Sequence, residues 1–187
     1  QEDHWSFRRS GWFEHVGNEV RHTAEHAGLL DMTAFAKCRI SGPGAEAFLD
    51  RLTANKLPKG IGRVSLSHAL TERGGVHSEY TIQRESADSF YVVSAGAGQR
   101  LDHDWIKKHM PDDGSVRFDN LTNSIGVLVL AGPKSRDILQ KLTRTDLSNE
   151  GFPWLSSRLI DVNMAPAMAF RMNYVGELGW ELHHPIE

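Results

Sequence analysis

One stretch of the chain occurs twice, and this repeat constrains the fold more than any other sequence feature. Residues 40–57 and 130–147 align without a gap at an offset of 90 residues. Six positions are identical in the two copies: Gly42 and Gly132, Pro43 and Pro133, Leu49 and Leu139, Leu52 and Leu142, Thr53 and Thr143, Leu57 and Leu147. Self-similarity at one fixed offset indicates a duplicated structural unit.

Each copy predicts a strand, a tight turn and then a helix. Glycine permits the unusual backbone of the turn, and proline is preset for the first turn of a helix. Apolar residues then recur at helical spacing, which predicts that one face of each helix is core: Phe48, Leu49 and Leu52 in the first copy, Ile138, Leu139 and Leu142 in the second.

Further strands and helices are predicted around the repeat. Alternating or β-branched runs between glycine-rich turns predict strands at 64–70, 76–82, 90–94, 159–162, 168–174 and 180–183. Helices are predicted at 19–29 and 100–109. The fold class expected from this order is α+β, with two related halves sharing one mixed sheet.

Composition and charge exclude several classes of protein. The 187 residues are 40% hydrophobic and 24% charged, which is ordinary for a globular domain. A net charge of −3, with no Lys or Arg run longer than a pair, argues against a nucleic-acid binder and against a polybasic membrane patch. The single cysteine, Cys38, rules out an intrachain disulfide and is interpreted as a buried thiol rather than a nucleophile.

Two patterns that suggest cofactor sites are set aside. The ten histidines lack the acidic or cysteine partners of a metal site, and the adjacent His183 and His184 are expected on opposite faces of a strand. We therefore predict no metal. Residues 94–98 follow a strand and precede a helix, but the third glycine of a dinucleotide loop is replaced by Leu101.

The segment 171–181 is the first candidate site. Tyr174, Glu177 and Glu181 surround a glycine-rich strand connection, where a carboxylate could accept two parallel hydrogen bonds from an amidine-like edge. The alternative is a surface hairpin with solvated acids.

Glu79 is the second candidate. It follows Gly74 and Gly75 on an otherwise apolar strand, and alternation places His77 and Glu79 on one face. A carboxylate there could be buried with a shifted pKa. A Glu that simply faces solvent would explain the pattern equally well.

Several motifs, taken in order, resemble the folate-binding aminomethyltransferase family, to which the T-protein of the glycine cleavage system belongs. The similarity is greatest to the region that follows the flavin domain in dimethylglycine and sarcosine dehydrogenases. The motifs cover nearly the whole chain from Trp12 onward and lie at residues 12–14, 28–35, 40–42, 52–55, 120–127, 131–133 and 174–181. The resemblance implies duplicated ferredoxin-like subdomains.

The resemblance also implies a function and assigns residues to it. In those dehydrogenases a flavin domain oxidises an N-methyl amine to an iminium, and tetrahydrofolate captures the one-carbon unit as 5,10-methylenetetrahydrofolate. Glu79 stands at the position of the family's catalytic aspartate. Tyr174 and Glu181 match the tyrosine and glutamate that hold the pteridine, with Glu177 between them. Ala95 stands where the family often has asparagine.

The resemblance finally implies a place for the chain in a larger system. We expect residues 1–18 to be a lead-in and 19–187 a folate-binding domain, with repeats at about 30–110 and 120–187 and the C-terminal part lying beyond Glu187. FAD would belong to a separate domain of the same longer protein, in the bacterial cytoplasm or the mitochondrial matrix. Two alternatives are a free-standing aminomethyltransferase or demethylase and a non-catalytic, folate-binding regulatory protein.

Overall fold

The computed structural model describes residues 7–172, 174 and 176–187. Its helices are α1 (Phe13–Glu25), α2 (Ala45–Leu52), the short 3-10 helix η1 (Gly96–Gly98), α3 (Gln99–His109) and α4 (Ser135–Gln140). Its strands are β1 (Gly28–Asp31), β2 (Ala36–Ser41), β3 (Val64–Leu70), β4 (Val76–Arg84), β5 (Ser89–Ser94), β6 (Arg117–Asn120), β7 (Ile125–Ala131), β8 (Ser157–Val162), β9 (Ala165–Phe170) and β10 (Gly179–Pro185).

The α+β class and the duplication are confirmed. One five-stranded sheet has the order β3-β4-β5-β2-β6 and the other β8-β9-β10-β7-β1, so each strand has a counterpart at the same place in the other sheet. All the pairings are antiparallel. The halves therefore form two antiparallel sheets instead of sharing one mixed sheet. Short connections join β3 to β4, β4 to β5 and β8 to β9, and antiparallel pairing follows from such connections.

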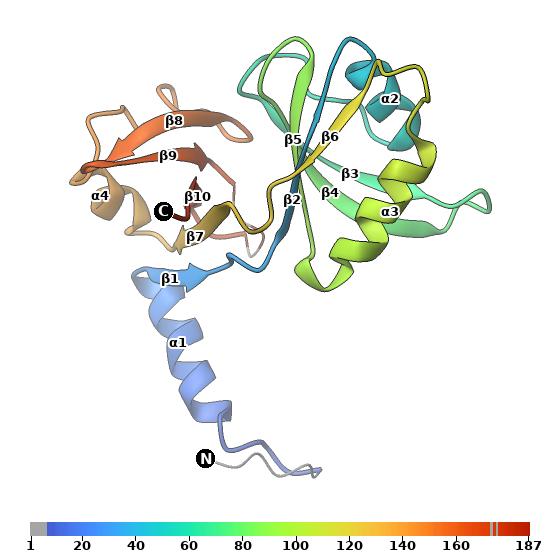
Figure 1. Cartoon of the computed structure of the whole chain (residues 1–187). Coiled ribbons are helices and arrows are strands. Elements are labelled where there is room, and N and C mark those ends of the chain that lie inside the picture. Colours follow the sequence, from blue (N-terminus) through green and yellow to red (C-terminus); the bar gives the residue numbers. More distant parts are fainter. Residues whose placement is uncertain (1–6, 173, 175) are drawn as a thin grey trace.

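The two halves exchange their edge strands. β1 precedes β2 in the chain but pairs with β7, and β6 precedes β7 but pairs with β2. The exchange is visible in Figure 1, where β1 lies beside the sheet of β7 to β10. Each half therefore depends on the other for the hydrogen bonds of one sheet edge.

The repeated glycines belong to this exchange. Gly42 and Gly132 have φ angles of 112° and 118°. A Cβ on Gly42 would lie 2.4 Å from the carbonyl oxygen of Ser115, and one on Gly132 would lie 2.5 Å from that of Thr23. Both contacts are with the segment that leads into the exchanged strand. The repeat thus preserves the same close backbone approach twice.

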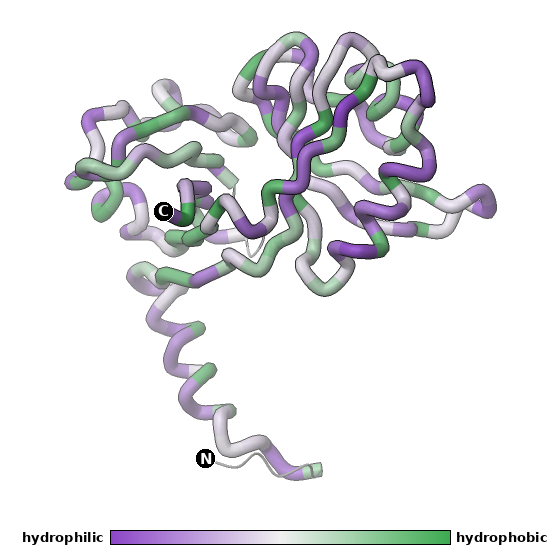
Figure 2. Tube along the Cα trace, in the orientation of Figure 1, coloured by the Kyte–Doolittle hydropathy of each residue, from purple (hydrophilic) through white to green (hydrophobic). Residues whose placement is uncertain are grey.

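The sheets pack face to face, with helices on the outer faces. The outer core of the first sheet joins β2, β4 and β5 to α2 and α3 through Ile40, Ile82, Phe48 and Ile106. The outer core of the second sheet joins β10 to α4 and the following loop through Trp180, Leu139 and Phe152. Between the sheets lie Val64, Tyr91, Val93, Phe170 and Met172. Strands β5 and β7 contain near-continuous apolar runs at 90–93 and 127–131, as burial on both faces of a sheet requires, whereas helix α1 is mostly hydrophilic in Figure 2.

The predicted helix at 19–29 is wrong at both ends. The helix α1 begins at Phe13 and ends at Glu25, and residues 28–31 form β1. Long-range pairing with β7 overrides the local helical pattern. The strand predicted at 168–174 ends at Phe170, and Asn173 lies outside the described residues. The helix α1 projects from the body of the molecule and has no buried residue (Figure 1).

Candidate functional site

A cavity of about 1210 Å³ opens between the two sheets and the end of α1. Its walls include all four residues that the sequence analysis selected: Glu79, Tyr174, Glu177 and Glu181. They come from opposite halves of the chain: Glu79 from β4, Tyr174 and Glu177 from the segment leading into β10, and Glu181 from β10 itself. The face-to-face packing of the sheets is what brings them together.

Glu181 is the buried acid of this cavity. Its residue is 7% exposed, and it lies on β10 between β7 and β9, opposite Val129 and Phe170. His183 Nε2 lies 3.1 Å from Glu181 Oε2. Among the hydrogen bonds between described residues, none uses Oε1. A buried carboxylate at the wall of a cavity is suited to receive donors from a ligand.

Glu79 lies on the opposite wall, and its side chain is 39% exposed. The suggestion that it is buried is therefore wrong. Its neighbour across the sheet is His68, whose Nε2 lies 3.1 Å from Glu79 Oε2. A partly solvated carboxylate that faces a cavity can exchange a proton with both ligand and water.

The prediction that His77 shares a face with Glu79 is also wrong. The β3–β4 pairing slips where Ala69 pairs with Ser78 and Leu70 with Val76, which leaves His77 as the extra residue of a bulge. Its ring stacks on Trp105 of α3, with 4.1 Å between the ring centroids. A bulge interrupts the alternation of faces on which the prediction depended.

Tyr174 and Glu177 form the open side of the cavity. Tyr174 is 83% exposed, so its ring lies at the rim and is free to pack on a bound ligand. Glu177 is half-buried on the same turn. The remaining wall is mostly apolar and includes Met32, Phe35, Val93, Val129 and Met172. An apolar wall with a few polar groups is typical of a small-molecule site.

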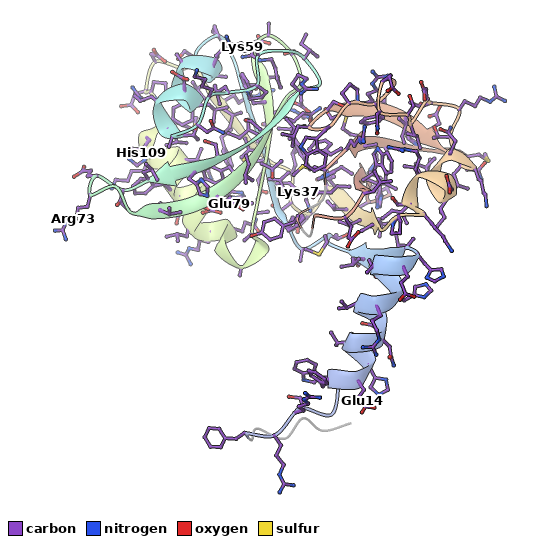
Figure 3. All side chains as sticks on the ribbon, turned by 180° about the vertical axis from the view of Figure 1, so that it is seen from behind. Glu14, Lys37, Lys59, Arg73, Glu79 and His109 are labelled. Carbon is purple, nitrogen blue, oxygen red and sulfur yellow. The ribbon has the colours of Figure 1, made fainter. Side chains whose placement is uncertain are left out.

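The cavity is acidic. Glu19 of α1 adds a fourth carboxylate, and no Lys or Arg is among its lining within the described part of the chain. Lys37 lies near the centre of the molecule, as Figure 3 shows, but it is fully buried and its Nζ donates to the carbonyl oxygen of Thr33 at 2.7 Å. Burial lowers the pKa of Lys37. A cavity whose charged lining residues are negative favours a cationic ligand or reaction partner.

The other features give no second site. Cys38 is buried, and burial raises the pKa of its thiol to about 12, which keeps it protonated and unreactive. Within the described ranges there is no group of three or more His, Cys, Asp or Glu residues that could hold a metal ion. Likewise, none of the helices described is long and apolar enough to cross a membrane.

Sequence reasoning missed two parts of the site, the end of α1 and His183. The C-terminal part of α1 forms one wall, through residues that include Glu19, His22 and Thr23, because α1 leads directly into β1, which pairs with β7. Ala95, which the resemblance pointed to, follows β5 directly and lines the cavity. His183 contacts Glu181, and the signal for it was present: two residues apart on a strand means the same face.

These observations define a class of protein: a duplicated α+β domain with a ligand cavity between its two sheets. The sequence model of the family described as "GCVT N-terminal domain" matches residues 2–187. The chain belongs to this family, the glycine cleavage T-protein or aminomethyltransferase family.

Relatives and solved structures agree with this membership. The chain is 39% identical over 183 residues to the mitochondrial dimethylglycine dehydrogenase of Mus musculus, covering 97% of this chain and 21% of that protein. It is 30% identical over 185 residues to the mitochondrial pyruvate dehydrogenase phosphatase regulatory subunit of Mus musculus, with the same coverages. The chain thus spans about a fifth of these relatives. The glycine cleavage aminomethyltransferase T of Bartonella henselae has the same fold, with a TM-score of 0.77 at 24% identity, covering 90% of this chain and 45% of that one.

Proposed function

We propose that the cavity binds tetrahydrofolate and that the chain is the region of an N-methyl amine dehydrogenase that captures a one-carbon unit. The observation that carries the proposal is the convergence of Glu181, Glu79, Glu177 and Tyr174 on one cavity between the sheets. Family membership and the 39% identity to a dimethylglycine dehydrogenase support it.

The residues present fit a reduced folate. The pteridine edge has an amino group beside a ring N–H, and a buried carboxylate such as Glu181 can accept both hydrogen bonds. Tyr174 would cover the ring at the rim, with Glu177 next to it on the same turn. The apolar wall of Met32, Phe35 and Met172 suits the flat faces of the ring.

The chemistry of capture assigns a separate role to Glu79. When bound, tetrahydrofolate supplies two nitrogens that both bond the incoming carbon and lose their protons, and the amine leaves with two hydrogens on its nitrogen. Glu79 lies on the other wall from Glu181 and would accept a proton from the attacking nitrogen, for which a carboxylate in contact with water is suited. The acidic lining would stabilise the cationic iminium as it approaches.

The rest of the proposed system lies outside this chain. We propose that residues 19–187 are the folate-binding domain of a longer protein, and that a separate FAD domain of that protein forms the iminium. A mitochondrial matrix or bacterial cytoplasmic location would follow from the relatives, whose names include mitochondrial enzymes. A free-standing aminomethyltransferase or demethylase of the same family would use the same cavity without a flavin partner.

One observation favours a non-catalytic alternative. The chain is 30% identical to a phosphatase regulatory subunit, so a member of this class could bind folate only to regulate a partner. Both functions require the ligand in the cavity. They differ in whether Glu79 affects the rate of one-carbon transfer.

Folate binding is tested by replacing Glu181 with Gln. Gln keeps the size of the side chain but offers one acceptor oxygen and adds a donor where the pteridine also donates. We expect tetrahydrofolate to bind roughly 30-fold more weakly to Glu181→Gln than to the unchanged chain, from the loss of about 2 kcal/mol in a charged hydrogen bond. Isothermal calorimetry under reducing conditions measures both affinities.

The matched control is Glu187→Gln, the same substitution on an exposed acid that does not line the cavity. It should leave the affinity unchanged. Equal affinity of the unchanged chain and Glu181→Gln would remove Glu181 from the site, and absence of binding by the unchanged chain would overturn the folate proposal.

A further inference from the structure

We propose that His183 is a positioning residue for the folate site: its neutral imidazole, with the proton on Nε2, holds the Glu181 carboxylate in place and is itself held by Tyr91. The expected effect of His183 on ligand binding rests on the proposed folate function. The geometry behind it stands independently in the structure.

Three side chains form a buried hydrogen-bonded row between the sheets. Glu181 and His183 lie two residues apart on β10 and therefore point to the same face, toward β5 of the other sheet. His183 Nε2 lies 3.1 Å from Glu181 Oε2, and Tyr91 Oη lies 3.1 Å from His183 Nδ1. The row thus links one sheet to the other and ends at the cavity wall.

The partners select one tautomer of the ring. A carboxylate oxygen only accepts hydrogen bonds, so Nε2 has to carry the proton that it donates to Glu181. Nδ1 is then an acceptor, and the Tyr91 hydroxyl donates to it. The other neutral tautomer would place two acceptors against each other at Nε2 and Oε2. Tyr91 therefore fixes the tautomer that Glu181 requires.

The surroundings keep this imidazole neutral and immobile. The His183 side chain is 2% exposed, stacks on Phe170 at a centroid distance of 4.5 Å and meets the edge of Tyr91 at 5.5 Å. Burial lowers the pKa of His183. Of the charged groups that act on it, Glu181 beside it favours the protonated ring, whereas Lys37 of β2 and the adjacent His184 oppose it.

The hydrogen bond from His183 fixes the orientation of the Glu181 carboxylate in the cavity. With Oε2 held by His183, Oε1 and the remaining lone pair of Oε2 are oriented to accept bonds from a ligand. The carboxylate would otherwise be free to turn about its terminal bond, and a misplacement of about 1 Å can cost a large factor in binding or rate. A packing residue of similar size could fill the space but could not orient the carboxylate.

The experiment is a double-mutant cycle in this chain, with tetrahydrofolate as the probe in calorimetry. His183→Met keeps the volume and removes the donor, and we expect it to weaken binding about tenfold, as loss of one hydrogen bond to a charged group does. In the Glu181→Gln background, His183→Met should weaken tetrahydrofolate binding by less than about a further twofold, because His183 acts on the ligand only by positioning the Glu181 carboxylate. His183→Gln, which retains an N–H near Nε2, should stay within about threefold of the unchanged chain.

A structural role gives different results. If His183→Met weakens binding equally in both backgrounds, or if His183→Gln is as weak as His183→Met, the positioning role is overturned. If His183→Met does not fold, Tyr91→Phe replaces it in the cycle, because it removes only the hydroxyl that fixes the tautomer. A loss that is again additive with Glu181→Gln would count against the proposal.

A second measurement separates this proposal from the folate proposal. Nitrogen-15 NMR of the histidine rings at pH 7, without ligand, should show His183 as the neutral Nε2–H tautomer, and Tyr91→Phe should shift its Nδ1 signal. An imidazolium or an Nδ1–H tautomer would overturn the inference whatever the folate result. The predicted spectrum without folate binding would mean that the row exists but serves another ligand.

Discussion

Replacing Glu79 with Gln is expected to slow one-carbon capture by tetrahydrofolate about 100-fold or more. Gln has nearly the same shape but cannot accept a proton, and a positioned acid or base typically contributes a factor of 10² to 10⁴. The affinity for tetrahydrofolate should change far less, because Glu181 and Tyr174 would hold the ring. The measurement is the rate of 5,10-methylenetetrahydrofolate formation from tetrahydrofolate and an iminium preformed from formaldehyde and sarcosine.

Two controls make the Glu79 result specific. Glu72→Gln makes the same substitution on an exposed acid near the same hairpin and should leave the rate unchanged. Glu79→Asp keeps the charge and introduces the residue that the resemblance implies at this position, so it should retain most of the rate. A Glu79→Gln rate within about threefold of the unchanged chain would contradict a catalytic role and favour the regulatory alternative.

The largest stability effect is expected at Trp180. Its side chain is fully buried, contacts the edge of Phe152 at a centroid distance of 6.4 Å and has the Arg136 guanidinium 5.8 Å above its ring. Trp180→Ala would leave a cavity in the outer core of the second sheet and should lower the free energy of unfolding by about 3–5 kcal/mol. Denaturation in urea, followed by circular dichroism, measures the loss.

Trp154→Ala is the matched control for Trp180. Trp154 is 51% exposed, so the same truncation should cost about 1 kcal/mol or less. Equal losses at the two positions would mean that the outer core of the second sheet is not packed as described. Trp180 also adjoins Glu181 on β10, so a destabilised strand should weaken folate binding at temperatures well below the unfolding midpoint.

Much of the fold was predictable because local sequence patterns indicate its helices and strands, and because the same pattern occurs in both halves of the chain. The repeat at 40–57 and 130–147 predicted the duplication, and the turn glycines are now explained by the backbone that passes against them. The sheet partners were not predictable from periodicity. Pairing of residues 28–31 with 128–131 is a contact between distant segments, and no local pattern specifies it.

The candidate site was predicted mainly by resemblance, and its geometry came only from the structure. Glu79 and Glu181 were selected from motifs far apart in the chain, and only the packing of the two sheets shows that they face one cavity. The prediction that His77 lies on the same face as Glu79 was wrong because a bulge interrupts the alternation of faces along β4. The role inferred for His183 depends on Tyr91, which lies on the other sheet, so sequence spacing could suggest only half of the contact.

The most direct test of the folate site is a crystal structure of this chain with tetrahydrofolate bound. We predict the pteridine between the two sheets, with its amino and N–H edge on the Glu181 carboxylate, the Tyr174 ring beside it and Glu79 toward the nitrogens that receive the carbon. A ligand bound outside this cavity, or inside it with Glu181 bonded to His183 alone, would contradict the account.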